Sequence, residues 1–137
     1  MTKRSALGLT DALVQMSFAV MTVLNRVAAD HDLSTTQLRV LGILVDRQPK
    51  MTELAEHLGL DKSSISGLID RAQARGLVER IASPDDGRSV HVSLTREGHT
   101  LARIGGQAIR QSVATLVGQL DVAERDQLRE LLARLTA

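Results

Sequence analysis

Two short amphipathic segments that follow each other almost without interruption constrain this fold more than any other feature. Residues 51–60 read MTELAEHLGL and carry their apolar side chains on one side of a helix. Residues 61–76 read DKSSISGLIDRAQARG, in which Asp61 is suited to an N-cap and Gly76 to the end of the helix. Two helices separated by a turn of about three or four residues with a glycine at its start indicate a helix-turn-helix.

A strand-like pair follows these helices directly. Residues 77–81 (LVERI) and 88–94 (RSVHVSL) are strand-like, and polar and apolar side chains alternate in the second. The stretch between them contains Pro84, Asp85, Asp86 and Gly87, which are typical of a tight turn. The sequence therefore predicts a protruding hairpin after the second helix, which is the arrangement of a winged helix-turn-helix.

The return strand of this hairpin leaves one question open. Either Val90 and Val92 or His91 and Ser93 face the body of the protein, because alternate side chains point to opposite sides of a strand. In both registers Arg88 lies at the tip. An arginine there can enter a minor groove of DNA, or it can pair with a neighbouring aspartate on the surface, a contact that contributes little.

Composition excludes several classes of function. There is no cysteine, so disulfides, thiolate catalysis and cysteine zinc sites are absent. Aromatic residues make up 1% of the chain, too few for base-stacking platforms. Neither a phosphate-binding glycine loop nor a nucleophile with an oriented acid is evident, so no enzyme and no cofactor are expected. No uninterrupted apolar run approaches the roughly 18 residues of a membrane span, and a cytoplasmic protein is expected.

The outer segments, 1–33 and 95–137, are expected to form long helices around a DNA-binding domain at 34–94. Their apolar stripes exceed what so small a core can cover, so we expect a two-fold dimer. An up-and-down monomeric bundle is the alternative. The expected dimerisation residues are apolar and spaced for helical stripes: Leu9, Leu13, Met16, Val20, Ile109, Val113, Leu116, Leu128, Leu131, Leu132 and Leu135.

A helical wheel of 61–76 separates two faces. One face is apolar and is expected to be buried: Ile65, Leu68, Ile69 and Ala72. The opposite face is small, rich in hydroxyl groups and partly basic, as suits a helix that enters a major groove. The alternative is a polar solvent face with a good N-cap.

The order of these motifs resembles the multiple antibiotic resistance regulator (MarR) family of bacterial transcription factors. KSSISGLIDRAQARG is followed by LVERIASPDDGRSVHVSLTREG, and the resemblance covers nearly the whole chain. It implies a mainly α fold with a two-stranded β wing and a homodimer with interleaved terminal helices. It also implies a small-molecule effector of unknown identity, bound in a pocket between the DNA-binding and dimerisation parts. The DNA-binding residues that it implies are Lys62, Ser63, Ser64, Ser66, Gly67, Arg71 and Arg88, with Asp86 as a partner for the arginines. Asp70 is expected to hold an arginine rather than touch DNA.

Two functions of different classes follow. The first is a dimeric repressor that a small molecule releases from a pseudo-palindromic double-stranded operator. The second is a winged-helix module that binds protein rather than DNA. A metal-responsive DNA-binding regulator is a variant of the first. His31 lies between two aspartates, Asp30 and Asp32, which are possible metal ligands. No two of the four histidines, however, have the spacing of metal ligands on one helix face, so no metal site is expected.

Overall fold

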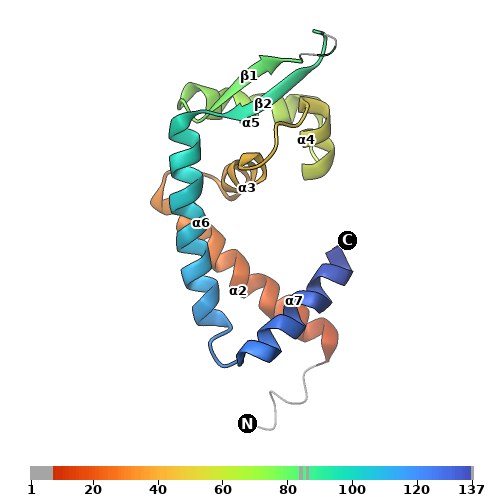
Figure 1. Cartoon of the computed structure of the whole chain (residues 1–137), viewed down its shortest axis with the longest axis vertical. Helices are drawn as coiled ribbons and strands as arrows, with labels where there is room; N and C mark the ends of the chain where they lie inside the picture. The colour runs from red at the N-terminus through yellow and green to blue at the C-terminus, as the bar shows by residue number, and fades with distance from the viewer. Residues whose placement is uncertain (1–7, 84, 86, 137) are drawn as a thin grey trace.

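A computed structural model describes residues 8–83, 85 and 87–136 of the chain. The elements in chain order are α2 (Leu9–Asp30), α3 (Thr35–Leu44), α4 (Met51–Leu58), α5 (Lys62–Ala74), β1 (Val78–Ala82), β2 (Val90–Leu94), α6 (Arg96–Leu116) and α7 (Val122–Thr136). The winged helix, made of α3, α4, α5 and the two strands, lies at one end of the molecule (Figure 1). Helix α6 runs from it to α7 at the other end, and α2 crosses α6 on the way.

The core lies within the winged helix and continues along α2 and α6. It is aliphatic, as the composition requires. The largest side chains that are almost fully enclosed are Val40, Leu41, Leu54, Ile69, Val78 and Val92. The buried residues of α5 are the four that the helical wheel selected, which confirms the predicted inward face.

Capping residues set the helix boundaries. Ser34 and Gln37 exchange side-chain and backbone hydrogen bonds of 3.1 and 3.2 Å at the start of α3. Thr95 accepts from the Gly98 amide at 3.0 Å at the start of α6. Gly59 and Gly76 have φ values of 68° and 73°, in the left-handed region that favours glycine at a helix end. Helix α6 ends at Leu116.

The wing is an antiparallel pair in which Val78 is opposite Leu94 and Ala82 is opposite Val90. Val92 is completely buried, whereas Val90 is 39% exposed. Ser93 on the other face is buried as well, and its hydroxyl accepts a hydrogen bond of 3.1 Å from Gln48 Nε2. Neither expected register therefore describes the strand fully: the loop before α4 covers one face of β2, and the core covers the other.

Helix α2 meets the length and composition requirements of a membrane-spanning helix, although the sequence contains no uninterrupted apolar run of that length. The observation is weak evidence, since core helices and signal sequences meet the same requirements. Here α2 packs against α3 and α6 and buries Val23, Val27 and Ala28.

Candidate nucleic-acid interface

The helix predicted to read DNA is α5, and Asp61 holds its first turn. The Ser64 amide donates to Asp61 Oδ1 at 2.7 Å, and the Ser63 hydroxyl donates to the same oxygen at 3.0 Å. The hydrogen bond from the Ser64 amide holds the pKa of the Asp61 carboxyl below its ordinary value. The Asp61 carboxylate therefore occupies the N-terminal amides of α5, and the exposed cation beside this turn is Lys62.

The residues expected to contact DNA lie together on this helix, outward of its buried face. Lys62, Ser63, Ser64 and Arg71 are exposed, and Ser66 and Gly67 are half-buried. A Cβ built on Gly67 would lie only 3.3 Å from Arg71 Nη1, so the Arg71 side chain folds back over the glycine. The short residues thereby make room for a cation near the middle of the helix surface.

Arg80 of strand β1 ties the wing to this surface. Its Nη2 donates to Asp70 Oδ1 at 2.8 Å, and its Nη1 donates to Gln73 Oε1 at 2.6 Å. The expectation that Asp70 holds an arginine is therefore confirmed. The sequence analysis did not single out Arg80, although strand alternation could have found it, because Arg80 lies two residues after the buried Val78 and so points to the same side.

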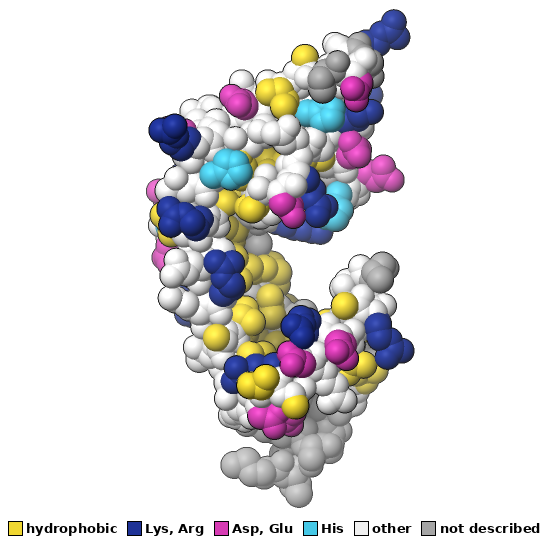
Figure 2. Space-filling view, in the orientation of Figure 1, with side chains coloured by type: hydrophobic (Ala, Val, Ile, Leu, Met, Phe, Trp, Pro, Cys, Tyr) yellow, Lys and Arg dark blue, Asp and Glu magenta, His cyan; other side chains and the backbone are white. Residues whose placement is uncertain are grey.

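The wing extends beyond the helices, and Figure 2 shows a basic side chain at its extremity. Arg88 is exposed, and Gly87 has φ 65°, so the turn contains the glycine that its backbone requires. Asp86, expected to take part in DNA binding, and Pro84, expected to shape the tip, lie outside the described residues. The DNA contacts of both the helix and the wing remain predictions.

Comparison with known proteins settles what kind of winged helix this is. A family model described as MarR family matches residues 31–89. The homoprotocatechuate degradative operon repressor of Escherichia coli is 30% identical over 132 residues, which cover 95% of this chain and 88% of that protein. The chain belongs to the MarR family.

Solved structures of MarR-family proteins have the same architecture. Wild-type MarR from E. coli in its apo form is similar with a TM-score of 0.79 at 25% identity, over 96% of this chain and 98% of that one. NadR in complex with 4-hydroxyphenylacetate is similar with a TM-score of 0.78 at 25% identity, over 94% of this chain and 92% of that one. As a MarR-family protein, the chain is a winged-helix transcriptional regulator that binds DNA.

The expected dimerisation residues of this MarR-family chain are largely uncovered. Helix α7 contains no buried residue, and Leu135 at its end is 72% exposed. Figure 2 shows hydrophobic side chains lining the hollowed side of the chain, between the winged helix and α7. The expected residues that are exposed are Leu9, Leu13, Met16, Leu116, Leu128, Leu131, Leu132 and Leu135. Val20, Ile109 and Val113 are half-buried within the chain itself.

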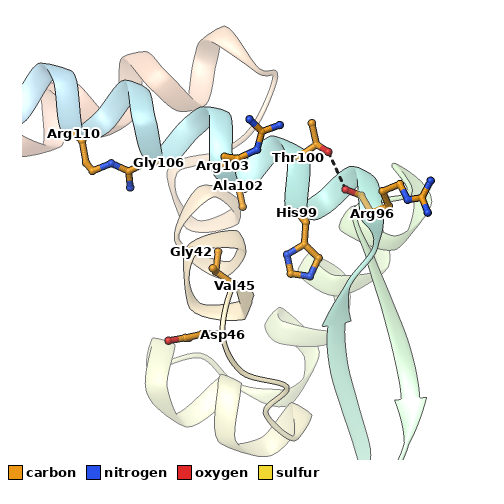
Figure 3. Close-up of a pocket in the computed structure, with 10 residues that line it drawn as sticks. All are labelled: Gly42, Val45, Asp46, Arg96, His99, Thr100, Ala102, Arg103, Gly106 and Arg110. Atoms are coloured by element: carbon orange, nitrogen blue, oxygen red, sulfur yellow. Dashed lines mark hydrogen bonds between the residues drawn. The ribbon is translucent and has the colours of Figure 1, made fainter.

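Two large hollows border helix α3. The family resemblance implies a small-molecule pocket between the DNA-binding and dimerisation parts, but the sequence indicates none of its lining residues. The larger, about 970 Å³, lies between α2, α3, α4 and α6; the residues that line it include Met21, Leu24, Leu38, Ile43 and Ile109 with Arg39 and Arg47. The smaller, about 700 Å³, lies between α3 and the first half of α6 and is shown in Figure 3. Its cations, Arg96, Arg103 and Arg110, leave α6 in different directions and do not converge on one point (Figure 3).

The histidines do not form a metal centre in the part of the chain that the structure describes. No group of three or more histidine or carboxylate side chains comes together there. His91 instead bonds through Nδ1 to the Gln48 carbonyl at 2.6 Å, which holds the loop before α4 against β2.

Proposed function

We propose that the protein is a homodimeric repressor that leaves its operator when an aromatic carboxylic acid binds between α2, α3 and α6. The observation that carries the proposal is that α7 buries none of its residues while presenting an apolar stripe. A second copy that covers this stripe would remove several large leucine side chains from water, each worth about 1.5–3 kcal/mol when fully buried.

A two-fold dimer would place two copies of α5 on one duplex. Lys62 and Arg71 on the helix and Arg88 on the wing supply cations for phosphates, and the short hydroxyl residues allow close approach to the bases. The operator should then be pseudo-palindromic, with half-sites about 34–36 Å apart or a multiple of that spacing.

The chemistry of the larger hollow supports an aromatic acid as the effector. Its lining is mainly aliphatic, and its volume of about 970 Å³ is sufficient for a small organic ligand. Among the described residues no carboxylate lies within salt-bridge distance of Arg39, whereas Arg47 pairs with Asp46 at 3.3 Å. Arg39 is therefore available for the carboxylate of a ligand.

Two relatives agree with this chemistry. One is the repressor of an operon for homoprotocatechuate, a hydroxylated phenylacetate, and the other, NadR, has 4-hydroxyphenylacetate bound. We therefore take 4-hydroxyphenylacetate as the probe for this protein.

The test uses the full chain and an operator recovered by pulling down genomic DNA fragments. Fluorescence anisotropy should show affinity that falls steeply with salt, with the logarithm of the association constant decreasing by about 0.9 per neutralised phosphate for each unit of log salt. A flat salt dependence would instead favour the protein-binding alternative.

The effector test adds 4-hydroxyphenylacetate, with its uncharged amide as the chemical control. The acid should release the DNA and the amide should not. Arg39→Met should bind DNA normally and lose the response, and Arg47→Met is the matched control because Arg47 already has a carboxylate partner. Release by the amide, or an intact response in Arg39→Met, would refute the placement of the carboxylate.

A further inference from the structure

Residues 75–77 form the corner between the recognition helix α5 and the wing. Both long helices, α2 and α6, contact this corner. Arg75 caps the C-terminus of α5, and Gly76 and Leu77 turn the chain into β1. The Leu77 amide donates back to the Ala72 carbonyl at 3.0 Å, which completes the end of the helix. The position of this corner therefore determines the direction in which α5 leaves the core.

Helix α6 holds the corner from one side. The Thr95 hydroxyl donates to the Gly76 carbonyl at 2.6 Å, and the Thr95 amide donates to the Leu77 carbonyl at 3.0 Å. Gly98 lies so close that a Cβ there would overlap the Leu77 carbonyl oxygen. The corner is therefore tightly packed against the start of α6, with no room for an added methyl group.

Helix α2 holds the corner from the other side through one guanidinium group. Arg75 Nη1 donates to the Asp32 carbonyl at 2.7 Å, and Arg75 Nη2 donates to the His31 carbonyl at 3.0 Å. The His31 carbonyl belongs to the C-cap of α2, at the end of the helix that carries a partial negative charge, and the Asp32 carbonyl comes directly after it. A planar fork that engages two successive carbonyls fixes orientation as well as distance.

The same helix α2 lines the larger hollow through Met21 and Leu24, within three turns of His31. A ligand that displaces α2 would therefore pull on Arg75, and Arg75 is the first residue after the recognition helix. Because Arg75 is exposed, its bonds contribute little to folding, so their removal should leave the fold intact.

We propose that Arg75 is a positioning residue that transmits movements of α2 to the recognition helix and so couples the effector hollow to DNA binding. The inference rests on the proposed function, in which the hollow and α5 bind effector and operator. It adds the residue through which the two sites communicate.

The first test compares Arg75→Met, which keeps an unbranched stem and loses the fork, with Arg26→Met, an exposed arginine of α2. Operator affinity is measured with and without saturating 4-hydroxyphenylacetate, and the ratio of the two affinities is the coupling. Arg75→Met should reduce this ratio by about fivefold or more, the lower end of usual allosteric couplings, while ligand affinity in the absence of DNA is unchanged. Arg26→Met should behave as the wild type. An unchanged ratio in Arg75→Met would refute the proposal.

The second test needs no effector. Hydrogen exchange of the α2–α3 turn, residues 31–34, is measured by mass spectrometry with and without operator DNA. Binding at α5 should slow exchange of this turn in the wild type and not in Arg75→Met; equal protection in both would refute the proposal. If the acid does not release the wild type but DNA protects the turn only when Arg75 is present, the effector assignment fails and the coupling stands. If the wild type binds no DNA, both fail.

Discussion

Gly98 in the first turn of α6 tests how tightly this helix packs on the corner after α5. An added Cβ would overlap the Leu77 carbonyl oxygen and lie 3.1 Å from Leu94 Cδ2. Alanine favours a helix over glycine by about 1 kcal/mol, but overpacking costs about 1–3 kcal/mol and can cost more when the obstacle is backbone. The Leu77 carbonyl cannot move away freely because it accepts from the Thr95 amide. We expect Gly98→Ala to lower the free energy of unfolding by about 2 kcal/mol.

Gly106 in the same helix provides the matched control. A Cβ there would lie 3.4 Å from Arg110 Nη1, the far end of a flexible side chain, so Gly106→Ala should gain the helix preference of about 1 kcal/mol. Both variants are unfolded in urea at one fixed protein concentration, because the stability of a dimer depends on concentration. The reasoning is refuted if Gly98→Ala is at least as stable as the wild type while Gly106→Ala is stabilised as expected.

Three further predictions concern the wing, the outer helices and the cap of α5. Arg88→Glu should abolish operator binding in an anisotropy assay and leave the dimer intact by size-exclusion chromatography; unchanged affinity would contradict the role of the wing. Leu131→Arg should shift sedimentation toward a monomer, and an unchanged sedimentation coefficient would show that α7 lies outside the interface. The pKa of Asp61 is lowered in the folded state, so its contribution to stability is present above its ordinary pKa of 3.8 and is lost as pH falls through the lower folded value. The wild type should therefore lose more stability than Asp61→Asn between about pH 5 and pH 3, and parallel urea curves would exclude this contribution.

Local features of the sequence predicted the elements well, because each boundary depends on neighbours a few residues away. Asp61 and Thr95 each cap the amide three residues ahead, and Gly59 and Gly76 adopt the left-handed backbone that ends a helix. The inward face of α5 followed from the period of the helix alone. The family followed from the order of these local motifs.

The burial of the β2 side chains could not be predicted from the alternating pattern of the strand. Val90 and Val92 have the same place in the alternating pattern, yet one is 39% exposed and the other is completely buried. What distinguishes them is what packs against the strand: the amide of Val92 donates to the Pro49 carbonyl at 3.0 Å, and Gln48 covers Ser93. Neither contact has a signal in the strand itself.

The sequence by itself determined the helices, the hairpin and the polar face of α5, since these depend on spacing and on short-range hydrogen bonds. Only the tertiary structure decided how those parts hold one another. The bonds from Arg80 to Asp70 and from Arg75 to His31 and Asp32 join residues 10, 44 and 43 positions apart. The larger hollow beside α3 exists only once α2, α3, α4 and α6 have packed. An arginine carries the same charge and the same donors wherever it stands in the sequence, so its partners are chosen by the packing that brings distant carbonyls and carboxylates within its reach.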